Sequence, residues 1–274
     1  LHEHGEIPYG DHTRDTIFLR QSENIPEEVI FCKKCVVSNQ RPRIVFNEEG
    51  ICGACLWAEE KNSLIDWEER EKEFKEVLDK HRSKDGRFDV IVPCSGGKDS
   101  GTVAHKLKYD YGMHPLAVTW SPLLYAEIGF QNIQNMISSG ISSHLFTPDR
   151  MEQRIFSKLS LVLVGDHFMA FSRGVTSYPY HVALDLGVKL IMLGENTELE
   201  YGGSLKHKDK PTYSIANAAE IHYKSTTTDE LVQFGIENGY FKKDVLNSPT
   251  LKYYTHPSVE DLENAGIENC WFGY

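Results

Sequence analysis

The sequence predicts an α/β protein: a doubly wound parallel sheet preceded by a small zinc ribbon. Three observations lead to this prediction. Short apolar runs, typical of buried parallel strands, alternate with amphipathic helical segments between residues 88 and 193. A glycine-rich turn joins the first of these runs to a helix, as in phosphate-binding α/β domains. Four cysteines near the N-terminus stand in two C-x2-C pairs.

The composition indicates a globular protein with an acidic charge balance. Among 274 residues, 40 Asp and Glu stand against 29 Lys and Arg, which gives a net charge of −11. Nucleic-acid binding depends on Lys and Arg neutralising phosphates, so no nucleic-acid partner is expected. The stretch 159–171 is too short and too polar for a membrane span of roughly 20 apolar residues. The N-terminus lacks the basic and apolar regions of a secretory signal, which predicts a cytoplasmic protein outside the membrane.

The paired cysteines indicate a metal site. Sixteen residues separate the two C-x2-C pairs, a spacing typical of four-thiolate zinc ribbons, and residues 43–46 between them are expected to form a short strand. Disulfides are disfavoured in a reducing compartment, and a redox site would need only one pair. Four thiolates fill the coordination shell of zinc, so the ion is expected to be structural. Its predicted ligands are Cys32, Cys35, Cys52 and Cys55.

The apolar run 88–93 leads directly into the glycine-rich turn. Backbone N–H groups at a helix N-terminus bind anions, and glycines let the backbone approach phosphate oxygens closely. The turn is not a Walker A motif, because the first glycine is missing and an aspartate follows the lysine. We predict that Lys98 supplies positive charge and that Asp99 holds Mg²⁺. The predicted pyrophosphate site of ATP comprises Ser95, Gly96, Gly97, Lys98, Asp99 and Ser100.

Further candidates follow the later strands, which are predicted at 116–120, 143–146 and 190–193. Ligands of open α/β sheets bind outside the carboxyl ends of the strands. Glu195 is therefore expected to be catalytic, whereas Val118 and Thr119 are expected on the adenine side. A solvated acidic loop remains an alternative for Glu198 and its neighbour Glu200. The candidate substrate-binding residues are Asn196, Glu198, Tyr201, Gly202 and Gly203.

The chain is expected to divide into four segments. Asp66 is the expected N-cap of a linking helix, and helices are predicted at 128–137, 150–163, 180–186 and, without a clear pattern, from 217 onward. The chain ends on an aromatic stretch, so C-terminal residues are expected to be missing. The segments are 1–62 with the zinc ribbon, 63–85 with the linking helix, 86–210 with the nucleotide-binding domain, and 211–274 as a helical C-terminal region.

Two resemblances add a function to these predictions. The turn at 95–100 resembles the pyrophosphate-binding loop of the PP-loop ATP pyrophosphatases, which have an adenine nucleotide alpha-hydrolase-like fold. Four stretches resemble, in order, the N-acetyl sugar amidotransferases of lipopolysaccharide O-antigen and related surface-glycan biosynthesis. These stretches are 46–52, 66–70, 92–100 and 194–203.

The resemblance implies a reaction and partners. ATP, with Mg²⁺, would transfer AMP to the acetamido oxygen of a nucleotide-activated N-acetyl sugar, and ammonia would replace that oxygen to give an acetamidino sugar. Lys98, Asp99 and Glu195 would carry the chemistry. A separate glutaminase subunit would supply the ammonia, because Cys94 and Cys270 are the only spare thiols and Cys94 abuts the phosphate loop. The alternatives are an ATP-dependent tRNA-thiolation enzyme and a non-catalytic adenine-nucleotide-binding module.

Overall fold

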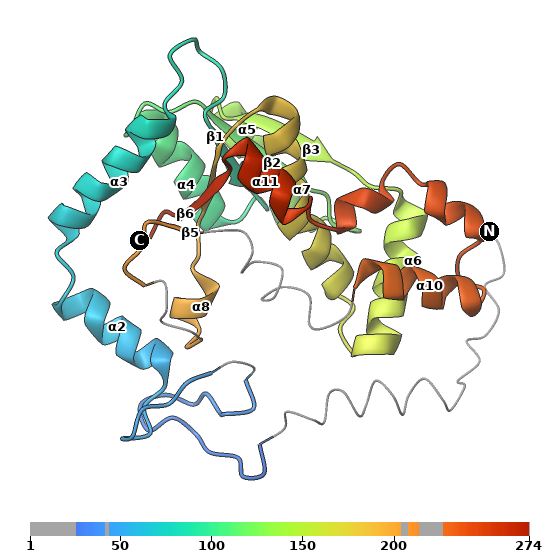
Figure 1. Ribbon diagram of the computed structural model, residues 1–274, viewed down its shortest axis with the longest axis horizontal. Coiled ribbons are helices and arrows are strands. Elements are labelled where there is room, and N and C mark those ends of the chain that lie inside the picture. Colours follow the sequence, from blue (N-terminus) through green and yellow to red (C-terminus); the bar gives the residue numbers. More distant parts are fainter. Residues whose placement is uncertain (1–25, 42–43, 204–207, 214–226, 274) are drawn as a thin grey trace.

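The computed structural model describes residues 26–41, 44–203, 208–213 and 227–273 (Figure 1). The centre of this part of the chain is a six-stranded sheet with the order β3-β2-β1-β4-β6-β5. All neighbouring strands are parallel except β5, which pairs antiparallel with β6. The strands are β1 (Val90–Pro93), β2 (Pro115–Trp120), β3 (Ser142–Phe146), β4 (Leu190–Leu193), β5 (Thr212–Tyr213) and β6 (Glu268–Trp271).

Helices cover both faces of the sheet, which confirms the predicted doubly wound architecture. Alternate strand residues point to opposite faces, so Ile91 packs in one core and its neighbours Val90 and Val92 pack in the other. The first face is covered by α6 (Arg150–Val164), α7 (Met169–Leu186), α10 (Thr228–Glu237) and α11 (Val259–Ala265). The second is covered by α3 (Trp67–His81), α4 (Lys98–Tyr109) and α5 (Glu127–Ser138).

The predicted helical character of the C-terminal region is wrong for residues 268–271, which form β6. This strand pairs in parallel with β4 along its whole length, from Leu190 opposite Glu268 to Leu193 opposite Trp271. The sheet therefore extends beyond the predicted segment 86–210. The terminal aromatic residues belong to the fold, because Trp271 is buried and the Phe272 ring packs edge-on against Phe74 of α3. Four strand residues after a short helix carry too little periodicity to identify them.

Three other expectations need correction or fall outside the described residues. Helix α7 begins at Met169 rather than at residue 180, and it accommodates Pro179. The sequence predicts a strand at 43–46 between the cysteine pairs. Among its described residues, Phe46 forms only an isolated bridge with Cys52, and Arg43 lies outside the described residues. Residues 1–25 and 214–226, including the start of the predicted C-terminal helices, also lie outside them.

Helices α6 and α7 account for the long apolar stretch in the sequence. No single helix in the described part of the chain is long and apolar enough to cross a membrane. The two helices together would pass that test by length and composition, but they are bent by 119° at the break between them. Both contribute side chains to the core beside the sheet, including Phe156 and Leu159 from α6 and Ala183 from α7.

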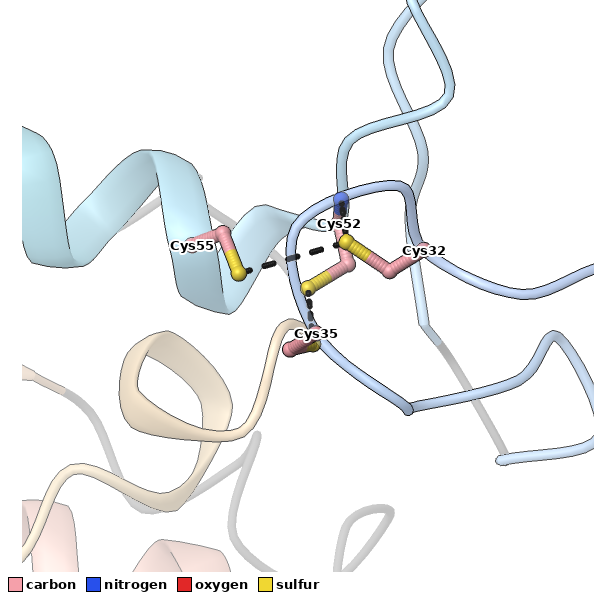
Figure 2. Close-up of side chains that lie close together, drawn as sticks. All are labelled: Cys32, Cys35, Cys52 and Cys55. Carbon is pink, nitrogen blue, oxygen red and sulfur yellow. Dashed lines mark hydrogen bonds between the residues drawn. The ribbon is translucent and has the colours of Figure 1, made fainter.

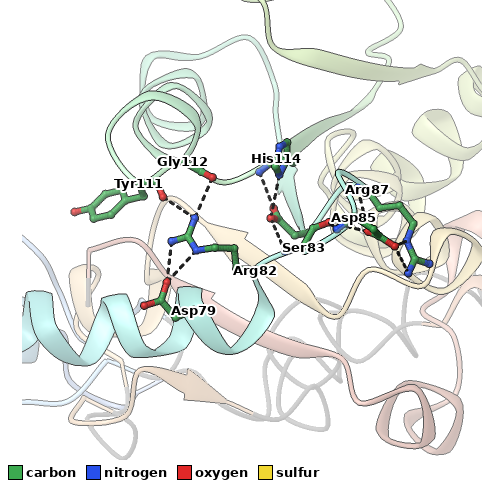
Figure 3. Close-up of polar contacts among 9 residues, drawn as sticks. Asp79, Arg82, Ser83, Asp85, Arg87, Tyr111, Gly112 and His114 are labelled. Carbon is green, nitrogen blue, oxygen red and sulfur yellow. Dashed lines mark hydrogen bonds and ion pairs between the residues drawn. The ribbon is translucent and has the colours of Figure 1, made fainter.

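The linking helix α3 begins as predicted and is fastened to the sheet at its end. The Asp66 carboxylate accepts hydrogen bonds from the N–H groups of Glu68 and Glu69, both at 3.1 Å, so Asp66 is the N-cap. Arg82, directly after the helix, donates to the carbonyl oxygens of Tyr111 at 2.8 Å and Gly112 at 3.0 Å (Figure 3). These bonds join the end of α3 to the turn between α4 and β2.

A helical glycine sets how closely α7 packs on the sheet. A Cβ atom added at Gly174 would lie 2.1 Å from Cε2 of Trp120, at the carboxyl end of β2. We expect Gly174→Ala to lower the free energy of unfolding by about 1–3 kcal/mol, because α7 must move away from the indole. In Gly101→Ala, a matched control in α4, the added Cβ meets no atom within 4 Å, and a gain of about 0.5–1 kcal/mol is expected. Denaturant unfolding of both variants checks this, and equal stabilities would contradict the packing argument.

Candidate active site at the carboxyl ends of β1 and β4

The glycine-rich turn and the segment after β4 lie together where the sheet changes winding direction. Strand β1 pairs with β2 on one side and with β4 on the other. The crossover from β1 to β2 runs through α4 on one face of the sheet, and the crossover from β3 to β4 runs through α6 and α7 on the other, so the winding direction changes between β1 and β4, the position where open α/β sheets bind ligands. A Cβ atom added at Gly194, directly after β4, would lie 3.7 Å from Cβ of Asp99. The first turn of α4 therefore lies against the end of β4.

The turn after β1 has the conformation of an anion-binding loop. Gly97 is the N-cap of α4, whose first turn begins at Lys98, so free amide N–H groups point to the carboxyl edge of the sheet. Gly96 has φ of +80°, and a Cβ atom there would lie 2.7 Å from Cγ1 of Ile133 on α5. Conformation and packing thus both require glycine. The Ser95 hydroxyl accepts a hydrogen bond from the N–H of Gly97 at 3.3 Å, which closes the turn.

Lys98 and Asp99 form an ion pair at the mouth of this loop. Lys98 Nζ lies 2.6 and 2.7 Å from the two carboxylate oxygens of Asp99. The side chains are 86% and 49% exposed, so the pair contributes little to stability and both groups can turn toward a ligand. The hydrogen bond that Lys98 donates to Asp99 and the negative charge of Asp99, followed by the charge of Glu195, raise the pKa of Lys98. Lys98 therefore carries its charge at every physiological pH.

The segment after β4 places Glu195 near this pair. The pKa of Tyr201 is raised first of all by the negative charge of Glu195, and the Tyr201 hydroxyl lies 3.4 Å from Oε2 of Glu195. Asn196 is buried, and its side-chain oxygen accepts the N–H of Leu199, so it caps α8 (Thr197–Glu200). Glu198 lies in α8, but its side chain lies outside what the structure describes. The structure thus brings Lys98, Asp99, Glu195 and Tyr201 together and gives Asn196 a capping contact.

The predicted adenine side lies on the strand next to the loop. The Val118 carbonyl accepts the N–H of Cys94 at 2.8 Å, which ties β2 to the start of the loop. The Val118 side chain is buried in the core, so only its backbone faces this edge. The Thr119 hydroxyl is also buried and has no hydrogen-bond partner among the described residues. An unpaired buried hydroxyl costs stability.

A groove extends from the loop between α4 and α5. Its volume is about 570 Å³, and it is lined by loop residues and by polar side chains of the two helices. Nothing in the sequence marks these helical residues as functional, because single polar residues on a helix face are ordinary surface features. The helical polar residues lining it are Thr102, His105, Lys106, Asp110, Asn132 and Asn135.

The four predicted metal ligands converge on one point (Figure 2). Their sulfur atoms all lie within 4.8 Å of one another, with 3.9 Å between Cys32 and Cys55 and 3.7 Å between Cys35 and Cys52. A tetrahedral zinc with bonds of roughly 2.3 Å requires sulfur separations of about 3.8 Å. All four are free thiols, so the alternative of two disulfides is not what the structure contains. The cluster has the geometry of a metal site.

The thiols of this cluster differ in acidity. Burial raises the pKa of Cys32, but hydrogen bonds from the backbone of Cys52, Lys34 and Cys35 outweigh it and bring the pKa down to about 6. Burial, together with the neighbouring thiols, raises the pKa of Cys55 to about 12. Cys32 is therefore the thiolate that is available first to a metal ion, and Cys55 gives up its proton only on binding.

Two solved structures resemble this chain in the course of the backbone. One is an NH3-dependent NAD synthetase from Campylobacter jejuni in complex with the nitrate ion, 15% identical, covering 74% of this chain and 94% of that chain with a TM-score of 0.35. The other is the U34-tRNA thiolase NcsA from Methanococcus maripaludis with its [4Fe-4S] cluster, 14% identical, covering 86% of this chain and 79% of that chain with a TM-score of 0.31. No family model and no curated protein matches the sequence.

Proposed function

We propose that this chain is an AMP-forming, ATP-dependent N-acetyl sugar amidotransferase of the PP-loop type, acting in the cytoplasm. It would convert the acetamido group of a nucleotide-activated N-acetyl sugar into an acetamidino group for lipopolysaccharide O-antigen or a related surface glycan. The observation that carries the proposal is the meeting of the glycine-rich loop, the Lys98–Asp99 pair and Glu195 at the switch point of the sheet. The order of the four family-like sequence stretches supplies the substrate class.

Several features of the crevice suit ATP. Amide groups at the start of α4 and the ammonium of Lys98 would bind the phosphates that leave as pyrophosphate. Asp99 would hold Mg²⁺ through its carboxylate, since magnesium prefers oxygen ligands and remains bound to phosphates. The unpaired Thr119 hydroxyl lies on the strand next to the loop, where it would receive a polar group of the adenine. Bound in this way, ATP supplies an AMP group that turns the acetamido oxygen into a leaving group.

The chain's own residues then have separate tasks. Lys98 neutralises the charge that develops on the departing phosphates, and it stays protonated because Asp99 and Glu195 raise its pKa. Asp99 would hold Mg²⁺ in place of its contact with Lys98, and the exposure of both side chains leaves them free to separate. Glu195 would accept a proton from the attacking ammonia or orient the acetamido N–H. The four-cysteine cluster would hold a structural zinc, since four thiolates leave no open coordination position.

The two cysteines outside the metal cluster are unsuited to glutamine hydrolysis, which favours an external source of ammonia. Cys94 and Cys270 are buried, and burial raises the pKa of each to about 12. A nucleophilic cysteine needs a lowered pKa and access to substrate, so neither is suited to hydrolyse glutamine or to carry a persulfide. This favours a separate glutaminase partner and counts against the tRNA-thiolation alternative.

An ammonia-dependence experiment tests the proposal. We expect the chain to produce AMP and an amidine with Mg·ATP, a nucleotide-linked N-acetyl sugar and ammonium, but not with glutamine alone. Free ammonia is the nucleophile, so the rate at fixed total ammonium should rise about tenfold per pH unit below the ammonium pKa. Mass spectrometry of the sugar should show the acetamido oxygen replaced by NH, and electrophoresis should show the added positive charge.

Two outcomes would contradict the proposal. If a panel of activated N-acetyl sugars gives no amidine while tRNA with a sulfur donor is thiolated, the thiolation function replaces it. If Mg·ATP binds but no substrate yields AMP, the chain is a nucleotide-binding module.

A further inference from the structure

The cysteine ribbon packs directly on the segment that follows β4. By ribbon we mean residues 30–41 and 44–55, which carry the four cysteines. The N–H of Val45 donates to the carbonyl of Gly202 at 3.0 Å, and the N–H of Gly53 donates to Val45 at 2.8 Å. Gly202 has φ of +84°, and a Cβ atom there would lie 3.1 Å from the backbone nitrogen of Ala54. The predicted substrate residue Gly202 thus has the ribbon as its observed neighbour.

Arg41 extends this contact from the ribbon to the candidate site. Its Nε donates to the carbonyl of Tyr201 at 2.9 Å, and its guanidinium carbon lies 5.0 Å from the centroid of the Tyr201 ring. One arginine therefore fixes both the backbone and the ring of Tyr201. The hydroxyl of that ring lies 3.4 Å from Oε2 of Glu195, and a Cβ atom added at the preceding Gly194 would lie 3.7 Å from Cβ of Asp99. Contacts therefore lead from the ribbon through Tyr201 to Glu195, whose neighbour Gly194 packs beside Asp99 of the phosphate loop.

Local contacts, and not the hydrophobic core, hold the side chain of Tyr201. Arg41 is exposed and could extend into water, yet it makes two different contacts with one residue. Tyr201 is 44% exposed, so its ring is not held by the core and depends on local partners. The described contacts of the Tyr201 side chain are Arg41 on one side and Glu195 on the other. The Tyr201 side chain therefore links Arg41 of the ribbon to Glu195.

We infer that the ribbon is a positioning element of the active site, and that Arg41 acts through Tyr201 to hold Glu195 opposite Lys98. Arg41 and Tyr201 are then positioning residues, not catalytic ones, since their contacts are with each other and with Glu195. The inference rests on the proposed function for the role of Glu195 in the reaction. The coupling between the ribbon and the loop, however, follows from the contacts alone and can be measured on nucleotide binding.

A double-mutant cycle tests whether Arg41 acts on Glu195 through Tyr201. We expect Arg41→Gln and Tyr201→Ala each to lower kcat/KM about tenfold in the ammonium-dependent reaction, the effect of lost charge-assisted and cation–π contacts. If Arg41 acts through Tyr201, the double variant should be little worse than Tyr201→Ala alone. Arg41→Lys should recover part of the rate, because it keeps a cation beside the ring and the carbonyl. Arg87→Gln is the matched control: Arg87 is an exposed arginine paired with Asp85 at 2.7 Å.

Metal content and thermal midpoint must be measured for each variant, and both are expected to match the wild type. Multiplicative effects of the two substitutions, or wild-type kcat/KM in Arg41→Gln, would overturn the inference. If the wild type turns over no acetamido sugar, the proposed function has failed. The same cycle is then run on the dissociation constant of Mg·ATP, where non-additive effects support the coupling and additive effects, or none, refute it.

Discussion

Replacing Lys98 or Asp99 with alanine is expected to lower AMP formation by about 10²–10³, the usual cost of one preorganised charge-stabilising group. Lys98→Ala removes the cation at the start of α4, whereas Asp99→Ala removes the carboxylate that would hold Mg²⁺. The fold should not change, because both side chains are exposed and their ion pair contributes little to stability. Single-turnover AMP release measured beside thermal unfolding separates the two effects.

Lys72→Ala offers a control for the loss of an exposed, paired lysine. Lys72 lies on α3 and pairs with Glu69 at 2.8 Å, so its removal also breaks a surface ion pair but touches no residue of the crevice. Its turnover should equal that of the wild type. Near-wild-type AMP release in Lys98→Ala would remove the loop from the mechanism. A matching loss of thermal stability would instead indicate a structural role.

Substitution of a cluster cysteine should abolish metal binding altogether. We expect one zinc per chain in protein purified without added metal, and none in Cys52→Ser, because a four-thiolate site binds with roughly 10–16 kcal/mol. Cys52 is fully buried among the other sulfurs, so in Cys52→Ser no water molecule can take the place of the missing thiolate as a ligand. Elemental analysis gives the content. Cys94→Ser, a buried cysteine outside the cluster, should keep its zinc.

The same site should bind metal more weakly as the pH falls. Burial raises the pKa values of Cys52 and Cys55, the latter to about 12, so both thiols must release protons when the metal binds. Apparent affinity should therefore decrease with falling pH throughout the neutral range, and more steeply below about pH 6, where Cys32 also becomes protonated. Calorimetry in buffers with different ionisation enthalpies reports the released protons. A pH-independent affinity, or a stable disulfide in place of metal, would contradict the assignment.

The sequence predicted those features that depend on neighbouring residues. The strand predicted at 88–93 and observed as Val90–Pro93, and the loop predicted at 95–100, whose residues from Lys98 on form the first turn of α4, follow from local hydrophobicity and from two glycines. The cysteine cluster follows from spacing alone. Asp66 was recognisable as an N-cap because its contacts lie only two and three residues away.

What the sequence could not predict depends on residues that are far apart in the chain. β6 is a strand because it fits between β4 and β5, and nothing within its four residues distinguishes it from the helices around it. Arg41 and Tyr201 are separated by 160 positions, so neither revealed the other. Gly202 was assigned to substrate binding from its motif, but its positive φ and its contact with Val45 emerge only in three dimensions.

The position of β6 has a consequence for the order in which the sheet assembles during synthesis. Strands β1 to β4 leave the ribosome first and can pair with one another, but one edge of β4 stays open until residues 268–271 emerge. An open edge of a buried, apolar strand is a template for wrong pairing. Between Leu193 and Glu268 the nascent chain must therefore carry this edge unprotected, and closing it requires a contact across more than a quarter of the chain. The last of the six described strands along the chain thus fills the position between β4 and the edge strand β5.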